Sequence, residues 1–123
     1  MQFFSGRAPV LLLALASMLG APFPARAHAI IVASAPAAGA TLHGSALPVL
    51  LRFNSRIDGE RSRLMLLRAD GSPVALKLVA SAGPDTMAAE AEGLAPGRYR
   101  LHWQVLAIDG HITRGDIPFE VVP

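Results

Sequence analysis

The sequence contains no cysteine among its 123 residues. Disulfide bonds are therefore excluded, although small exported domains often depend on them. Blue-copper sites, iron–sulfur sites and zinc sites built on thiolates are excluded for the same reason. Any metal ion held by this chain must be bound through nitrogen, oxygen or thioether sulfur.

Net charge is also small. Eleven basic and nine acidic residues give a formal charge of +2, and two of the basic ones, Arg7 and Arg26, lie near the start of the chain. Without these two, basic and acidic residues are equal in number. A neutral domain lacks the basic surface that phosphate recognition requires, so we expect no nucleic-acid partner.

A single long apolar run is present, over residues 8–19, and it is shorter than the roughly 20 residues of a membrane span. Arg7 precedes the run, and Ala25-Arg26-Ala27 follows it after several helix-breaking residues. This order is typical of a secretory signal peptide with small residues at positions −3 and −1. We predict a signal peptide over residues 1–27 and an exported domain over residues 28–123, with no membrane insertion.

Cleavage after Ala27 would make His28 the first residue of the exported chain. The free α-amine and the imidazole Nδ1 of that residue can bind one metal ion in a six-membered chelate ring. Ala27-His28-Ala29 fits the same cleavage pattern, however, and a cut after Ala29 would remove the histidine. The sequence leaves both cleavage sites open.

Beyond residue 28 the hydrophobic pattern is that of β-strands, with no convincing helix. Alternation is clearest over residues 98–107, and Asp70-Gly71 is a strong hairpin signal. Strands are expected over residues 29–34, 48–54, 63–69, 73–81, 87–92, 98–107 and 116–122. These short strands with regular turns predict an all-β fold, a seven-stranded antiparallel β-sandwich or Greek-key barrel.

The loop Asp109-Gly110-His111 follows the most strongly patterned strand. Loops at strand ends often carry function, because the scaffold holds them in place and leaves them accessible. Residues i and i+2 of an extended segment point the same way, so Asp109 and His111 can converge on one point. The alternative interpretation is an ordinary Asp-Gly turn followed by a surface histidine.

Four donor atoms are then available for one metal ion. They are the amine and Nδ1 of His28, an imidazole nitrogen of His111 and a carboxylate oxygen of Asp109. This nitrogen-rich set in a tetragonal plane suits Cu(II), which also heads the affinity order of divalent ions. Zn(II) could bind the same donors as a tetrahedron, so the donor set alone leaves the metal open.

Four stretches of the sequence resemble the CopC family of periplasmic copper-resistance proteins, which includes YobA-type proteins. Residues 28–41 open on histidine and run through an apolar strand into Ser-Ala-Pro-Ala-Ala-Gly. Residues 50–55 resemble the second strand of that family. Residues 94–105 resemble its Pro-Gly-x-Tyr strand, and Asp109-Gly110-His111 then matches its Asp-x-His copper loop.

The resemblance implies a seven-stranded Greek-key β-barrel, immunoglobulin-like or cupredoxin-like, that binds one Cu(II) per chain in the periplasm. The copper ligands of the family fall on His28, Asp109 and His111. A carrier or buffer of copper without enzymatic activity is implied, which hands the ion to an inner-membrane transporter of the CopD type. We expect a monomer.

Two departures from the family pattern are visible. Some members carry a glutamate close to the Cu(II) site, where this chain has Ser55. Others bind Cu(I) through a methionine-rich loop, whereas the predicted exported domain has only Met65 and Met87. We therefore expect a binder of Cu(II) only, with His102 as an ordinary surface residue. We expect His43 to face solvent as well, although the sequence leaves open whether it approaches the metal.

Two other functions stay open at this stage. A terminal histidine with a second histidine also resembles the histidine brace of copper-dependent polysaccharide monooxygenases, but those sites lack an equatorial carboxylate such as Asp109. A metal-free immunoglobulin-like interaction module would result if cleavage removed His28. Four protein donors would fill the plane, whereas catalytic metals keep an open position, so we expect a binding protein rather than an enzyme.

Overall fold

The computed structural model describes residues 28–123, so the predicted signal peptide over residues 1–27 lies outside the described part. All regular structure in residues 28–123 is β-strand. The strands are β1 (Ile31–Ala35), β2 (Ala40–His43), β3 (Leu47–Phe53), β4 (Ile57–Arg68), β5 (Pro73–Val74), β6 (Lys77–Val79), β7 (Thr86–Ala91), β8 (Gly97–Ala107) and β9 (Ile112–Val122). Accordingly, this part of the chain contains no helix long and apolar enough to cross a membrane.

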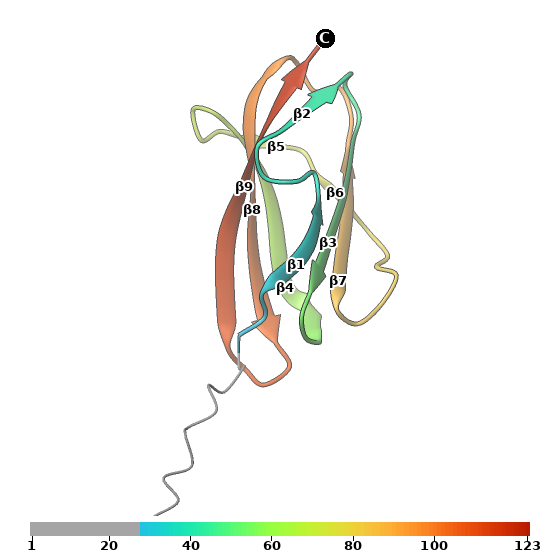
Figure 1. Cartoon of the computed structure of the whole chain (residues 1–123), viewed down its shortest axis with the longest axis vertical. Coiled ribbons are helices and arrows are strands. Elements are labelled where there is room, and N and C mark those ends of the chain that lie inside the picture. The colour runs from blue at the N-terminus through green and yellow to red at the C-terminus, as the bar shows by residue number, and fades with distance from the viewer. Residues whose placement is uncertain (1–27) are drawn as a thin grey trace, which may run out of the picture.

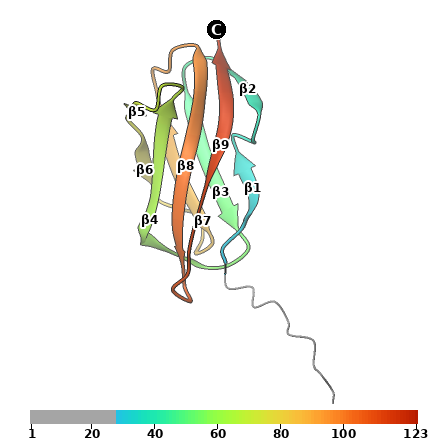
Figure 2. The same ribbon diagram turned by 90° about the vertical axis from the view of Figure 1, so that its left-hand side faces the viewer.

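The strands form two sheets packed face to face as a β-sandwich (Figure 1). One sheet has the strand order β1-β3-β7-β6, and the other has the order β2-β9-β8-β4-β5. Figure 2 shows the five-stranded sheet from outside, with β4, β8 and β9 side by side. The prediction of an all-β sandwich is confirmed.

The core lies between the sheets and is built from residues that alternate along each strand. In β3, Leu47, Val49, Leu51 and Phe53 are buried while the residues between them are exposed. The inward face predicted for residues 98–107 is likewise found, since Tyr99, Leu101 and Val105 are buried and Trp103 packs partly buried against the core. Burying a side chain of the Leu or Phe type stabilises the fold by about 1.5–3 kcal/mol.

Residues 28–123 contain nine strands where seven were predicted, and two differences in topology account for this. The strand predicted over residues 73–81 is divided between the sheets, because β5 pairs with β4 and β6 pairs with β7. The short strand β2 was not predicted, and it pairs with β9 in parallel. It was missed because four residues are too few for an alternating pattern to stand out. Its parallel pairing means that the sandwich is not fully antiparallel, in contrast to the prediction.

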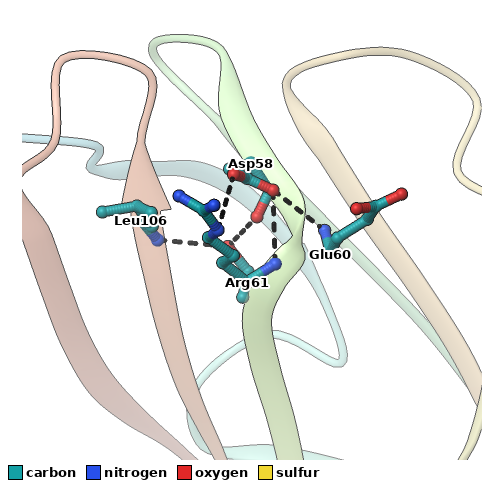
Figure 3. Close-up of polar contacts among 5 residues, drawn as sticks. Asp58, Glu60, Arg61 and Leu106 are labelled. Atoms are coloured by element: carbon teal, nitrogen blue, oxygen red, sulfur yellow. Dashed lines mark hydrogen bonds and ion pairs between the residues drawn. The ribbon is translucent and has the colours of Figure 1, made fainter.

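The strand β4 starts at Ile57, earlier than the predicted start at residue 63. Its pairing with β8 is irregular between Asp58 and Arg63. The buried Ser62 hydroxyl donates to the Asp58 carbonyl oxygen at 2.6 Å and accepts from the Leu106 backbone N–H at 3.1 Å. The Asp58 carboxylate accepts from the backbone N–H of Glu60 and also lies near Arg61 (Figure 3). A bulge breaks the two-residue period, so the sequence pattern does not reveal this part of the strand.

The hairpin predicted at Asp70-Gly71 is confirmed. Gly71 has φ of +84°, and its backbone N–H donates to the Arg68 carbonyl oxygen at 2.8 Å. The Asp70 carboxylate accepts from the Ser72 hydroxyl at 2.6 Å and from the Ser72 backbone N–H at 2.9 Å. These bonds, the hydroxyl first, hold the pKa of Asp70 below its ordinary value.

Candidate metal centre

The β8–β9 loop, residues 108–111, closes the long antiparallel pair formed by β8 and β9. The Gly110 backbone N–H donates to the Ala107 carbonyl oxygen at 2.9 Å, and the Ala107 N–H donates to the His111 carbonyl oxygen at 2.8 Å. Gly110 has φ of +92°, a conformation that glycine adopts without steric cost. The segment is thus a tight turn rather than the extended stretch from which convergence was predicted.

Asp109 and His111 nevertheless contact each other across this turn. Oδ1 of Asp109 accepts from the His111 backbone N–H at 3.1 Å, and Oδ2 lies 3.2 Å from His111 Nδ1. The backbone hydrogen bond is the main reason that the pKa of Asp109 lies below its ordinary value. An ionised carboxylate only accepts hydrogen bonds, so Nδ1 of His111 carries the proton in this contact and Nε2 keeps its lone pair.

His28 lies just ahead of β1, and β1 starts at the end of the sandwich that carries the β8–β9 loop (Figure 1). The carbonyl oxygen of the buried Ala29 accepts a hydrogen bond from the Thr113 hydroxyl of β9 at 2.8 Å. Ile30 and Asn54 are joined twice, since the Ile30 N–H donates to Asn54 Oδ1 and the Asn54 N–H donates to the Ile30 carbonyl oxygen, each at 2.9 Å. These contacts fix the backbone that carries His28 beside the β8–β9 loop.

The rings of His28 and His111 lie with centroids 5.3 Å apart and planes at 77°. Metal–nitrogen bonds of about 2.0 Å put a ring centroid about 3 Å from the ion, so two imidazoles on one ion have centroids about 4–6 Å apart. The observed separation fits a shared ion.

The three predicted ligands are brought together in pairs rather than as a closed cluster. His111 contacts both His28 and Asp109, yet within residues 28–123 no group of three or more His, Asp or Glu side chains is close enough to hold a metal ion. The fourth predicted donor is the α-amine of His28, which is a peptide nitrogen while Ala27 precedes it. The predicted donor set is therefore complete only after cleavage.

The side chains at this end are open to solvent. The side chain of His111 is 54% exposed and that of Asp109 is 40% exposed. Ile108, the first residue of the loop, and Ile112, the first residue of β9, are also exposed. An ion bound here would be accessible from outside without any movement of the sandwich.

The other two histidines lie elsewhere. His43 ends β2 beside Val122, with Nδ1 3.5 Å from the Pro123 carbonyl oxygen, at the end of β9 opposite to the β8–β9 loop (Figure 1). It therefore does not approach the candidate centre. His102 lies in the middle of β8, where Nδ1 is 2.8 Å from Asp116 Oδ1.

Sequence reasoning missed the residues that position His28. Thr113 carries no signal in the sequence that would distinguish it from other strand threonines. Asn54 was placed at the end of a predicted strand, but its bonds to Ile30 depend on how two distant segments meet.

Fold and site together define a small β-sandwich domain with two histidines and an aspartate at one end. The family model for the CopC domain matches residues 31–122. The chain therefore belongs to the CopC domain family, and the predicted resemblance is confirmed. Asp109 and His111 lie within the matched region, whereas His28 lies just before it.

Solved structures of the same family are similar over most of this chain. CopC from Methylosinus trichosporium OB3b is 31% identical, with a TM-score of 0.72, over 78% of this chain and 95% of that one. PcoC, a methionine-rich copper resistance protein from Escherichia coli, is 27% identical, with a TM-score of 0.68, over 78% of this chain and 100% of that one. None of the curated proteins compared with the chain matches its sequence.

Proposed function

We propose that this protein binds Cu(II) in the periplasm, one ion per chain, through His28, Asp109 and His111, and carries or buffers the ion. Membership of the CopC domain family supports copper as the metal, since the similar PcoC structure is that of a copper resistance protein. The observation that carries the proposal is the approach of the His28 ring to His111, which itself contacts Asp109.

Each residue has a defined part in this proposal. After cleavage at Ala27, His28 supplies its α-amine and Nδ1, and His111 supplies Nε2. The Oδ1 atom of Asp109 stays on the His111 backbone N–H, while Oδ2 exchanges its ring contact for the metal. Nitrogen donors with one carboxylate in a plane suit Cu(II).

We propose a carrier rather than an enzyme, because the four donors leave no in-plane position for a substrate. The receiver in this proposal is an inner-membrane transporter of the CopD type. The solvent-exposed ligands and the exposed Ile108 and Ile112 beside them support direct hand-over, since a partner can contact the site without opening the fold.

Electron paramagnetic resonance of the exported protein with one equivalent of Cu(II) tests the proposal. A chain beginning at His28 should give a tetragonal, nitrogen-rich spectrum. A chain beginning at Ala27 should give a different spectrum and bind more weakly, because its amine lies one residue away from the ring.

Two histidine variants are the matched pair for this experiment. His111→Ala should change the spectrum, and His43→Ala, at the opposite end of the sandwich, should leave it as it was. If the chain beginning at His28, the chain beginning at Ala27 and the His111→Ala variant all give the same spectrum, the proposed ligands are wrong.

A further inference from the structure

Three side chains form a second candidate site on the outward face of the five-stranded sheet. His102 of β8 is directly paired with Met65 of β4 on one side and with Asp116 of β9 on the other. Directly opposite residues on neighbouring strands point to the same face, with Cβ atoms about 4.5–5.5 Å apart. The row Met65–His102–Asp116 therefore crosses the three strands that lie side by side in Figure 2.

Asp116 orients the imidazole of His102. Its Oδ1 lies 2.8 Å from His102 Nδ1, and an ionised carboxylate accepts hydrogen bonds only, so Nδ1–H is the donor. The lone pair is then on Nε2, the ring nitrogen left for a ligand. This carboxylate–histidine arrangement is the one that commonly supports metal-binding histidines, since it fixes the ring and raises its basicity.

Met65, directly opposite His102 on the neighbouring strand, adds a soft sulfur donor to the same face of the sheet. It is 45% exposed, whereas Met87, the other methionine of residues 28–123, is buried in the core. A thioether is polarizable and selects soft ions such as Cu(I), and imidazole is compatible with copper as well.

The surrounding charges favour an ion of low charge. Arg63, Arg100 and Arg114 lie two residues along the same outward face, at diagonal positions about 7–8 Å from the row. Repulsion by these cations is proportional to the charge of the bound ion, so a divalent ion is disfavoured twice as strongly as a monovalent one. Asp116 is the single carboxylate in the row.

We propose that the Met65 thioether and His102 Nε2 bind a soft monovalent ion, Cu(I) or Ag(I), with Asp116 as the positioning residue. His102 lies about 17 Å from the Ala107 end of β8, at a rise of about 3.4 Å per residue, so the site is separate from the β8–β9 loop. It does not depend on the proposed function. It contradicts the expectations of a binder of Cu(II) only and of an ordinary surface role for His102.

Titration of the exported protein with Ag(I), followed by ¹H–¹³C NMR, tests this site. The Met65 methyl and His102 ring signals should shift together and saturate at one equivalent, while the Met87 methyl signal stays in place. Zn(II) should not shift the Met65 methyl signal.

Variants test whether Ag(I) is bound by the Met65 sulfur and by the His102 ring that Asp116 positions. Asp116→Asn removes the residue that positions His102 and should weaken Ag(I) binding by about 10–100-fold. Met65→Leu removes a ligand itself and should weaken Ag(I) binding by at least as much. Met87→Leu is the matched control with unchanged affinity. Met65→Leu conserves volume at an exposed position, so the fold is retained, which circular dichroism checks.

Two results would overturn the inference. One is an Ag(I) affinity of Met65→Leu equal to that of the unaltered protein. The other is a Met65 methyl signal that does not move. His111→Ala distinguishes this site from the Cu(II) site of the proposed function, since it should change the Cu(II) spectrum of the β8–β9 loop and leave the Ag(I) shifts unchanged.

Discussion

Replacing Gly115 with alanine should destabilise the sheet that carries the β8–β9 loop. Gly115 is paired with Trp103, and the indole ring lies over the glycine. A Cβ atom at this position would lie 2.6 Å from Trp103 Cζ2, 2.8 Å from Cε2 and 2.9 Å from Nε1. Ordinary carbon–carbon contacts are about 3.5–4.0 Å, so the ring or the strand must move by about 1 Å.

The ring has little freedom to move. Trp103 packs edge-on against Phe53 of the core, with centroids 5.5 Å apart and planes at 66°. Overpacking of this kind costs about 1–3 kcal/mol. Each kcal/mol lowers Tm by about 4–8 °C in a domain of this size, so Gly115→Ala should melt about 5–20 °C lower. Urea unfolding followed through the fluorescence of Trp103, the single tryptophan of the chain, measures the loss.

Gly59→Ala is the matched control, because a Cβ atom there meets nothing within 4 Å and neither glycine has a positive φ. Its stability should stay close to that of the unaltered protein. Adding Trp103→Leu to Gly115→Ala should recover part of the loss, since contacting residues couple energetically. Circular dichroism follows the unfolding of this double variant, because it contains no tryptophan. If Gly115→Ala unfolds at the same urea concentration as the unaltered protein, the close packing described above is wrong.

Three further changes are expected to have measurable effects. Ser62→Ala should cost about 1–3 kcal/mol in urea unfolding, since the Leu106 N–H loses its buried acceptor, whereas Ser81→Ala at an exposed site should not. Asn54→Ala should weaken Cu(II) binding in a competition titration, because Ile30 and hence His28 lose an anchor, and equal affinity would contradict that role. The lowered pKa of Asp109 means that its hydrogen bonds stabilise the fold above the ordinary carboxyl pKa, and that this stabilisation is lost as pH falls through the lowered pKa. Carboxyl NMR titration should therefore show Asp109 titrating below an unstructured aspartate, and Asp109→Asn should reduce the acid sensitivity of unfolding.

The sequence predicts best those parts of the fold whose pattern is local. Residues 98–107 alternate almost perfectly, and β8 has the inward face that this alternation indicates. Asp70-Gly71 specifies its hairpin because glycine takes the positive φ of the turn without strain.

Features that depend on distant partners were missed. The strand β2 is visible only through its parallel pairing with β9, and the early part of β4 is hidden by the bulge that Ser62 stabilises. The division of residues 73–81 between two sheets likewise follows from pairing with β4 and β7 rather than from composition.

In the candidate site, too, the local contact could be predicted from the sequence pattern and the contact between distant segments could not. Asp109 and His111 are neighbours in the chain, so their contact could be expected, although a turn rather than an extended segment produces it. The approach of His28 was suggested by a resemblance, and its physical cause, the anchoring by Thr113 and Asn54, is tertiary. The pairing of Met65 with His102 required the strand register, which no pattern in the sequence reveals.

A crystal structure of the chain beginning at His28, loaded with one equivalent of Cu(II) and with the metal located by anomalous scattering, tests the central claim most directly. The account predicts one copper ion at the end of the sandwich, bonded to the amine and Nδ1 of His28, to His111 and to Asp109. A copper ion located elsewhere, or one at the β8–β9 loop without a bond to His28, would contradict it.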